Sequence, residues 1–405
     1  MGNKEFIFIT RFFSGLYETI ENETWQPSGI PTIANLVDKA SKNHKVTWFL
    51  VSKTMGESSL INHKQKKILI NNIQFVVLPY KKFPFFINKF NNTIQTLFIF
   101  YRFRFFFKNH KKAIYYFDRS NIILAGLIKT LYKAFVVIRI LGIYPAQKKI
   151  VKNFYYKTKN LITYCAYNIN YDLCVGTQDG SGTEFYIDKL INQQTPRMVL
   201  LNGVSNNVSK KKERSTKINI LFVGSLIEAK GILDFVEAAK NLKEYHDRIQ
   251  INIVGKGILA KQLKLFIEKH NLTDFVFLVG SLPKKKVSEM FLQSDIYVSL
   301  NKLGNLSNTV LEAMSFSKCI FILEKEPLFH IDMYTDKYIP HDVVVRINRR
   351  NIVEDLSIKI IDLIENPSKI KLYSQKTSFF MNANMQSWDK RIDLEITSIL
   401  EMYNN

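Results

Sequence analysis

The strongest constraint on the fold of this 405-residue chain is a series of short apolar segments separated by segments of helical periodicity. Helix-like segments at 31–41 and 121–134 carry apolar residues at spacings of three and four. Alternating strands and helices predict βα units that build a parallel sheet. The strand-like segments of the first half are 5–10, 45–51, 74–78, 113–117, 135–140, 173–175 and 198–202.

The pattern stops at residues 205–217 and then starts again. This stretch, SNNVSKKKERSTK, is polar and lacks periodicity, so it is the predicted linker between two domains. The second series predicts strands at 218–223, 251–254, 275–279, 296–300 and 319–323, and helices at 232–242, 259–270, 285–293 and 307–316. We therefore predict an α/β protein with Rossmann-like domains at 1–204 and 218–380, with ligands at the carboxyl ends of the strands.

The net charge of +22 is concentrated in one segment. Residues 81–160 hold 17 Lys and Arg and one acidic residue, Asp118, so they carry +16 of the total. One basic surface is therefore expected, and no known nucleic-acid-binding motif accompanies it, so nucleic acid is not an expected partner. Three widely spaced cysteines support neither a disulfide framework nor a zinc site, so a reducing cytoplasm is the simplest compartment.

The most apolar part of this basic segment is 93–107, TIQTLFIFYRFRFFF. It is shorter than the ~20 residues that a spanning helix needs, and it contains Arg102 and Arg104. Its mixture of aromatic and basic residues is typical of an interfacial segment on anionic lipid. A buried aromatic helix with solvated Lys flanks is the alternative, and the sequence leaves both interpretations open.

Several turns of the second half suit a phosphate-bearing ligand. In GSLIEAKG, Gly224 and Ser225 follow a strand and Lys230 lies where a helix begins, so an ammonium and free helix amides would favour the same anion. Such a turn is also common in α/β proteins without this function. IVGKG gives a second turn, with Lys256, and VFLVGSL a third.

The fourth turn, GNLSNTVLEAM, opens a helix. The amides of Asn308, Thr309 and Val310 would lack intrahelical acceptors there and could hold a diphosphate. Glu312 follows about one turn later and could accept hydrogen bonds from ribose hydroxyls. A Glu that simply complements the helix dipole is the structural alternative.

Together these segments resemble the retaining glycosyltransferases of family four, which have the GT-B fold. The matching stretches are specific over 218–323 and read GSLIEAKG, IVGKG, VFLVGSL, SDIYVSL and NTVLEAMS. Asn202-Gly203-Val204 and Ser387-Trp388 extend the resemblance more weakly. It implies two Rossmann-like domains facing across a cleft, and a helix at 381–405 that crosses back to the first domain.

The resemblance implies a nucleotide-sugar donor, with UDP as the expected nucleotide and no metal or cofactor. Lys230 would contact the diphosphate, Thr309 and Val310 would supply amides, and Glu312 would bind the ribose. Ser281 and Leu282 would lie by the base, and Gly29 would let a first-domain loop approach the sugar. The expected donor-binding residues are Gly29, Gly224, Ser225, Lys230, Lys256, Ser281, Leu282, Asn305, Leu306, Ser307, Asn308, Thr309, Val310 and Glu312.

Three positions depart from the family pattern. Ser225 replaces an Arg, Gly304 replaces the first Glu of a Glu pair that touches the sugar, and Leu141 replaces a His. The Asn-rich loop that follows Gly304 is expected to hold the sugar by amides instead. Arg139 is expected to supply positive charge to the cleft, beside Lys230 and Glu312 as catalytic residues; a surface Arg at a strand end is its structural alternative.

The function expected from the resemblance is transfer of a sugar, with retention, to a hydroxyl of a glycan or lipid-linked acceptor in cell-surface polysaccharide or glycolipid synthesis, such as lipopolysaccharide or capsule. The acceptor would bind the first domain, and residues 81–160 would lie on an anionic membrane at its cytoplasmic face. A catalytically silent scaffold of the same fold is the alternative, and the three departures favour it.

Overall fold

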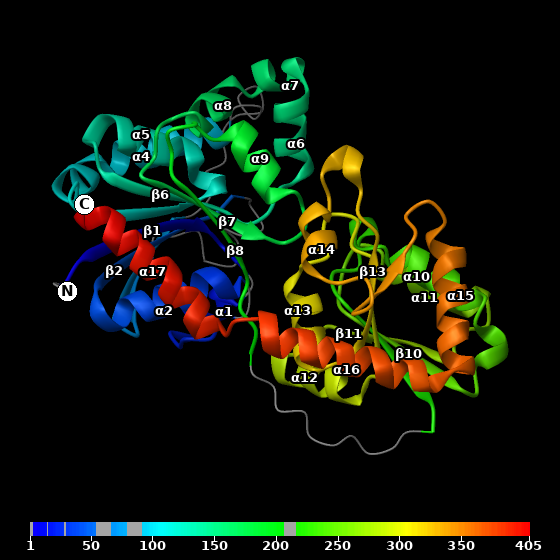
Figure 1. Cartoon of the computed structure of the whole chain (residues 1–405). Helices are drawn as coiled ribbons and strands as arrows, with labels where there is room; N and C mark the ends of the chain where they lie inside the picture. Colours follow the sequence, from blue (N-terminus) through cyan, green and yellow to red (C-terminus); the bar gives the residue numbers. More distant parts are fainter. Residues whose placement is uncertain (1–2, 14, 28–29, 54–65, 79–90, 206–215) are drawn as a thin grey trace. The chain divides into compact units, whose positions relative to one another are not determined.

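The computed structural model describes residues 3–13, 15–27, 30–53, 66–78, 91–205 and 216–405, which form two compact units (Figure 1). Unit 1 holds residues Met1–Thr177, Thr183–Leu200 and Trp388–Asn405, and unit 2 holds Gln178–Gly182 and Leu201–Ser387. Residues 206–215 of the expected linker lie outside the described ranges.

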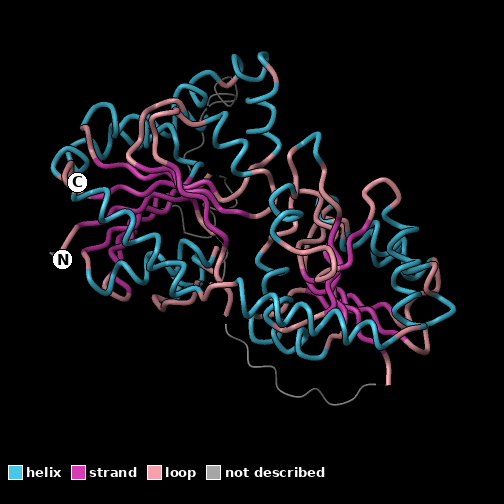
Figure 2. Tube along the Cα trace, in the orientation of Figure 1, coloured by secondary structure: helices cyan, strands magenta, loops and turns pink. Residues whose placement is uncertain are grey.

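Unit 1 is built on an eight-stranded sheet in the order β3-β4-β2-β1-β5-β6-β7-β8 (Figure 2). Each registered pair from β4 to β7 is parallel, whereas β3 and β4 form an antiparallel hairpin at the sheet edge. The strands are β1 (Glu5–Arg11), β2 (Lys45–Val51), β3 (Lys66–Ile70), β4 (Ile73–Leu78), β5 (Ile114–Asp118), β6 (Phe135–Ile140), β7 (Leu173–Gln178) and β8 (Arg197–Leu201).

Both faces of this sheet are covered, because side chains alternate along each strand. On β1, Phe6 and Phe8 join the core beneath α1 (Leu16–Asn22), α2 (Pro31–Asn43) and α17 (Trp388–Asn404). Ile7 and Ile9 point the other way, into the core under the opposite helix layer. The helices that contribute to that core are α4 (Asn91–Asn109), α5 (Ile122–Tyr132), α6 (Pro145–Lys152), α8 (Leu161–Tyr167) and α9 (Thr183–Leu190), whereas α7 (Phe154–Lys159) has no buried residue.

The aromatic segment 93–107 lies within α4. Phe107 is completely buried and Ile99 nearly so, whereas Tyr101 and Phe105 keep 66% and 64% of their surface exposed. The helix thus packs one side on the core, as the buried-helix interpretation requires, and presents aromatic rings on the other. No helix within the described ranges is long and apolar enough to cross a bilayer.

A buried ionic cluster attaches α17 to the sheet of unit 1. Arg139 on β6 donates to the Glu395 carboxylate at 3.2 Å and to Thr177 Oγ1 at 2.7 Å, and Arg391 pairs with the same carboxylate. Tyr116 on β5 donates to Glu395 Oε1 at 2.6 Å. Burial acts to raise the pKa of Glu395, but the two guanidinium groups and Tyr116 hold it below its ordinary value.

This cluster corrects both interpretations of Arg139. Its side chain is fully buried, so it is not a surface residue, and its charge is directed at Glu395. Arg139 therefore joins the C-terminal helix to β6 and is not available as a catalytic cation.

Unit 2 contains a six-stranded sheet in the order β11-β10-β9-β12-β13-β14, with every registered pair parallel. This order matches the doubly wound arrangement, in which the chain moves outward from one central strand and then returns to its other side. The strands are β9 (Ile218–Val223), β10 (Ile249–Val254), β11 (Val276–Gly280), β12 (Ile296–Ser299), β13 (Cys319–Leu323) and β14 (Val345–Ile347).

Helices also cover both faces of the unit 2 sheet. Ile220 and Phe222 of β9 join the core that includes α10 (Ile232–Lys240), α11 (Ala260–Lys269) and α15 (Ile352–Glu365). Leu221, between them, joins the core on the other face. The helices there are α12 (Lys284–Gln293), α13 (Asn308–Ser315) and α16 (Pro367–Asn384), and α14 (Met333–Tyr338) follows β13 in sequence.

Replacing Glu395 with Ala tests the ionic cluster. The change leaves Arg139 and Arg391 as buried cations without their carboxylate, and losing one member of a buried pair costs about 3–5 kcal/mol. We expect the free energy of unfolding of unit 1 to fall by that amount. It is measured by urea denaturation, followed by fluorescence and circular dichroism. The matched control is Glu401→Ala, an exposed position on the same helix; equal stability of the two variants would contradict the assignment.

Candidate functional site

The candidate site lies at the carboxyl edge of the unit 2 sheet, between β9 and β12. These strands are neighbours although far apart in sequence, so the connections that follow them leave toward opposite sides. The resulting crevice is where doubly wound sheets bind ligands.

A cavity of about 300 Å³ occupies this position. It includes predicted residues from two separate motifs, Gly224, Ser225 and Lys230 from the first and Ser307, Asn308 and Thr309 from the fourth. The sequence did not single out the other lining residues, because the pattern identifies residues at a strand end as strand without showing which of them face a cavity. These are Phe222, Val223, Tyr297, Ser299 and Asn301.

Lys230 provides the positive charge of the cavity. It ends a short 3₁₀ turn, Glu228–Lys230, and its amide donates to the Ile227 carbonyl oxygen at 3.0 Å. Burial lowers the pKa of its ammonium group, and the negative charge of Asp179 opposes that shift. A partly desolvated cation is stabilised by an anion brought beside it, so this wall of the cavity suits phosphate.

The start of α13 forms the facing wall. Ser307 precedes the helix without a side-chain cap, and the first helical bond runs from the Leu311 amide to the Ser307 carbonyl. The amides of the first turn therefore have no acceptor within the helix. Ser307 Oγ and Thr309 Oγ1 lie 3.0 Å apart, and Asn202 donates to Asn308 Oδ1 at 2.7 Å. The positive end of the helix dipole thus adds to the charge of Lys230.

Glu312 lies one turn further into α13 and is half-buried. Burial raises the pKa of its carboxyl group, and Lys284 opposes that shift. The charge of Glu312 also acts on Tyr297, a lining residue whose pKa is raised chiefly by burial. Glu312 is therefore close to the cavity, although it is not one of its lining residues.

Two predicted residues of the Asn-rich loop are turned away from solvent. Asn305 and Leu306 are completely buried. Asn305 Nδ2 donates to Asp332 at 2.7 Å, and the Leu306 side chain belongs to the core around α13. The Asn305 side-chain amide is thus engaged inside the protein, and the amide contacts to a sugar that are expected of this loop stay a prediction for its other amides. Val310 is equally buried, so only its backbone can face a ligand.

Backbone contacts join the first turn to the second and the second turn to the third. The Leu226 amide donates to the Lys256 carbonyl and the Gly255 amide to the Gly280 carbonyl, at 3.0 and 2.8 Å. A Cβ atom at Gly255 would lie 1.8 Å from the Gly224 carbonyl oxygen, so no other residue fits. Lys256, Ser281 and Leu282 lie beyond the 300 Å³ cavity, and the first two are exposed. Gly29 lies outside the described residues.

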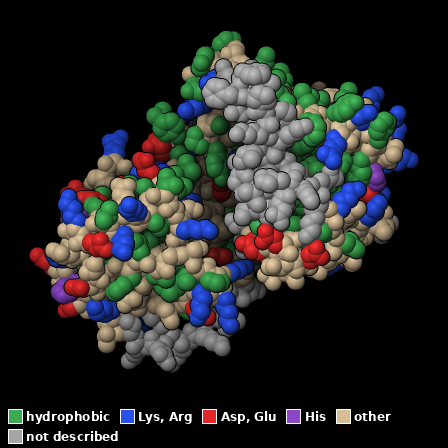
Figure 3. Space-filling model, turned by 180° about the vertical axis from the view of Figure 1, so that it is seen from behind, with side chains coloured by type: hydrophobic (Ala, Val, Ile, Leu, Met, Phe, Trp, Pro, Cys, Tyr) green, Lys and Arg blue, Asp and Glu red, His purple; other side chains and the backbone are tan. Residues whose placement is uncertain are grey.

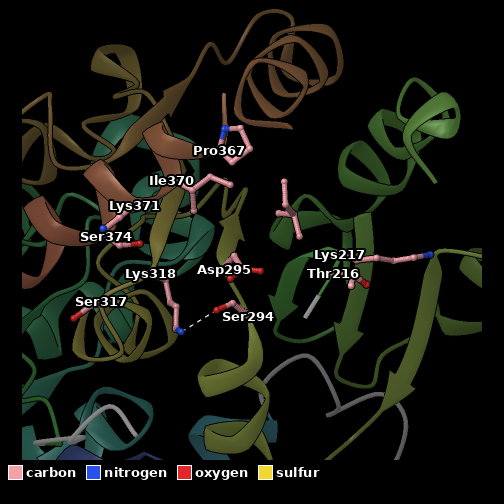
Figure 4. Close-up of a pocket in the computed structure, with 11 residues that line it drawn as sticks. Thr216, Lys217, Ser294, Asp295, Ser317, Lys318, Pro367, Ile370, Lys371 and Ser374 are labelled. Atoms are coloured by element: carbon pink, nitrogen blue, oxygen red, sulfur yellow. Dashed lines mark hydrogen bonds between the residues drawn. The ribbon is translucent and has the colours of Figure 1, made fainter. Parts of the chain in front are cut away.

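A second cavity, of about 400 Å³, lies at the opposite edge of the same sheet (Figure 4). Its lining includes Ile218, the first residue of β9, and Asp295 and Lys318, which directly precede β12 and β13. Lys318 Nζ donates to the carbonyl oxygens of Ser294 and Leu292 at 2.8 and 3.3 Å. The Lys318 charge thus stabilises the carboxyl end of α12. Because this Lys already serves the helix end, the cavity between β9 and β12 remains the candidate site.

Comparison with known families supports this assignment. The family model described as Glycosyl transferases group 1 matches residues 204–376, which include every lining residue of the candidate cavity. The chain is 27% identical over 194 residues to MJ1069 of Methanocaldococcus jannaschii, an uncharacterized glycosyltransferase, and the alignment covers 47% of each protein. It is 35% identical over 81 residues, 20% of each chain, to the amylovoran biosynthesis glycosyltransferase AmsK of Erwinia amylovora.

The fold comparison extends over the whole chain. The Anabaena protein Alr3699/HepE, solved in complex with UDP, superposes with a TM-score of 0.67 and 12% identity, covering 98% of this chain and 99% of that one. The sequence matches, in contrast, span about half or less of the relatives' length. Residues 204–376 therefore match the group 1 glycosyltransferase family model, and the chain has the GT-B fold.

Proposed function

We propose that the protein transfers a sugar, with retention of configuration, from a nucleotide donor to a hydroxyl of a glycan or lipid-linked acceptor. The single observation that carries this proposal is the convergence of Lys230 and the start of α13 on one cavity in a group 1 glycosyltransferase domain. The role of AmsK in amylovoran biosynthesis supports a pathway of cell-surface polysaccharide or glycolipid synthesis.

The donor proposed is a UDP-sugar. Lys230 and the amides of Asn308, Thr309 and Val310 would bind the diphosphate, and the UDP in the complex of Alr3699/HepE supports this nucleotide. Glu312 would accept hydrogen bonds from the ribose hydroxyls. Because an ammonium group and a helix start together offset much of the diphosphate charge, this proposal assigns no metal ion to the site.

Catalysis would depend on electrostatic stabilisation of the departing diphosphate. Lys230 and the α13 amides are fixed by the strands and turns that carry them, so they need little reorganisation when charge develops. The acceptor hydroxyl would attack on the face that the diphosphate leaves, and the departing phosphate would take its proton. This sequence gives retention without a protein base.

Unit 1 would bind the acceptor and an anionic membrane surface. Phe154 and Tyr155 of α7 keep 80% and 64% of their surface exposed, and Leu161 and Ile162 of α8 are also exposed. Basic side chains of the same helices lie among these rings, with Lys157 Nζ 4.1 Å from the centre of the Tyr164 ring. Lys and Arg side chains are interspersed with hydrophobic ones on the face shown in Figure 3. Rings beside ammonium groups suit the interface of an anionic bilayer, at the cytoplasmic side of the plasma membrane.

A catalytically silent scaffold of the same fold is the second candidate, favoured by Ser225, Gly304 and Leu141 at positions where the family pattern has charged or titratable residues. Turnover separates the two candidates. A scaffold would bind the nucleotide without hydrolysing the donor or forming product, whereas the enzyme would release UDP from one of a panel of UDP-sugars.

Lys230→Ala should abolish most donor affinity and turnover. Loss of a charge-assisted hydrogen bond costs about 1.5–3 kcal/mol, so we expect UDP to bind about 10- to 100-fold more weakly by calorimetry. Since burial lowers the pKa of Lys230, UDP affinity of the unmodified protein should also fall as the pH rises through that lowered pKa, and the variant should lack this step.

The control for Lys230→Ala is Lys261→Ala, an exposed Lys on α11. Undiminished UDP affinity in Lys230→Ala would contradict the phosphate role. Inverted product, determined by NMR of the anomeric proton, would contradict the retaining mechanism independently.

Glu312→Gln should weaken binding through the ribose alone. The neutral amide keeps one acceptor oxygen but loses the charge that strengthens hydrogen bonds from hydroxyls. We expect affinity for UDP to fall about tenfold while affinity for 2′,3′-dideoxy-UDP is unchanged. Equal losses for both nucleotides would show that Glu312 acts by another route.

Phe154→Ser with Tyr155→Ser should reduce membrane binding. Co-sedimentation with phosphatidylglycerol vesicles should fall severalfold, and vesicles of phosphatidylcholine alone should bind poorly in every case. Phe379→Ser is the matched control, because Phe379 is 79% exposed but lies on α16 of unit 2. Binding that is insensitive to anionic lipid would contradict the proposed surface.

A further inference from the structure

A turn that follows β7 belongs to unit 2 and packs against the loop before α13. This turn, Gln178–Gly182, is separated from that loop by more than a hundred residues of sequence. The Leu306 amide donates to the Asp179 carbonyl at 3.1 Å, and the Asp332 amide donates to the Gly180 carbonyl at 2.6 Å. Backbone hydrogen bonds thus fix the turn to the edge of the candidate site.

The turn occupies the space that a side chain at position 304 would need. Gly304 has φ +146°, and a Cβ atom there would lie 2.6 Å from the Asp179 carbonyl oxygen, the Gly180 carbonyl carbon and the Ser181 amide. Gly304 is therefore required by the packing of the turn. The carboxylate that the family pattern would place at 304 cannot exist in this chain together with the turn.

Asp332 makes the arrangement rigid. Its carboxylate accepts from the Asn305 amide and Asn305 Nδ2, both at 2.7 Å, from Thr335 Oγ1 at 2.8 Å and from Arg349 Nη2 at 2.9 Å. Asp332 is almost completely buried, so these bonds are shielded from water. The turn and the loop before α13 are consequently held in one relative position.

In addition to the Asp332 carboxylate, this edge of the site has the carboxylate of Asp179. Its Oδ1 accepts from the Ser181 amide at 3.0 Å and from Ser181 Oγ at 2.5 Å, which fixes the rotamer. The side chain is half-buried, and its charge acts on Lys230, a lining residue of the cavity. Asp179 is therefore close enough to Lys230 for its charge to act on the ammonium group, and its backbone carbonyl oxygen would lie 2.6 Å from a Cβ atom at Gly304.

We propose that Asp179 accepts hydrogen bonds from hydroxyl groups of the donor sugar, and so replaces the carboxylate missing at position 304. The inference rests on the proposed function, since it needs a nucleotide sugar with its diphosphate at Lys230. A sugar linked to that diphosphate presents several hydroxyl donors, and an ionised carboxylate is their strongest acceptor. The carboxylate comes from a sequence-distant turn because the turn itself excludes a side chain at Gly304.

The test compares Asp179→Asn with the unmodified protein by calorimetry, using UDP, UDP-glucose, UDP-galactose and UDP-N-acetylglucosamine. Asn keeps the oxygen that accepts from Ser181, so the turn should stay folded, and the thermal midpoint is measured as a check. Loss of the Asp179 charge acts on Lys230 with either ligand, so the readout is the ratio of UDP-sugar affinity to UDP affinity, which we expect to fall about 10- to 100-fold for the UDP-sugar that binds best. Asp274→Asn, exposed on unit 2, is the control.

The outcomes separate the inference from the proposed function. Failure of the unmodified protein to bind UDP or any UDP-sugar would overturn the proposed function and the inference together. Three results would overturn the role of Asp179 alone. In the first two, Asp179→Asn weakens UDP and the UDP-sugar equally, or leaves the affinity for the UDP-sugar relative to UDP unchanged. In the third, no UDP-sugar binds the unmodified protein more tightly than UDP does. Selective loss of the sugar contribution would support it.

Discussion

Direct backbone contact between turns at the carboxyl edge of the unit 2 sheet is the constraint on which the candidate site depends. The turns after β9 and β10 approach so closely that Gly255 has no room for a side chain beside the Gly224 carbonyl. A similar approach at Gly304 admits the Asp179 turn. Because each turn is fixed by its neighbours, Lys230 and the start of α13 face the same cavity without a flexible connection. Preorganised charge of this kind is what stabilisation of a leaving diphosphate requires.

The charged residues have different roles in the two units. In unit 1, two arginines are neutralised in part by the Glu395 carboxylate and serve the attachment of α17, while the exposed basic residues of α6 to α8 lie among aromatic rings. In unit 2, a single partly desolvated ammonium and a helix start form the positive region. The large net charge of the chain therefore says little about the cavity, where one cation and oriented amides matter most.

Local pattern predicted the strands well where both faces are buried. The predicted limits of β2, β6, β9 and β13 agree with the structure, since parallel strands between two helix layers are continuous apolar runs. The edge strands β3 and β14 were missed because they are short or flanked by polar residues. The helices α6 to α8 were missed because their sequence, rich in Lys and Tyr, has no apolar stripe long enough to be recognised.

The sequence alone determined two α/β series, the order of the phosphate-suited turns, and the identity of Lys230, Thr309 and Glu312 as candidates, because these depend on spacing within single segments. Tertiary structure decided which side chains are available. It placed Arg139 against Glu395 and Asn305 against Asp332, and it brought Asp179 to the loop before α13. Contacts between different elements, from 27 positions apart for Asn305 and Asp332 to 256 for Arg139 and Glu395, leave no periodic trace in the chain, so only the folded structure reveals them.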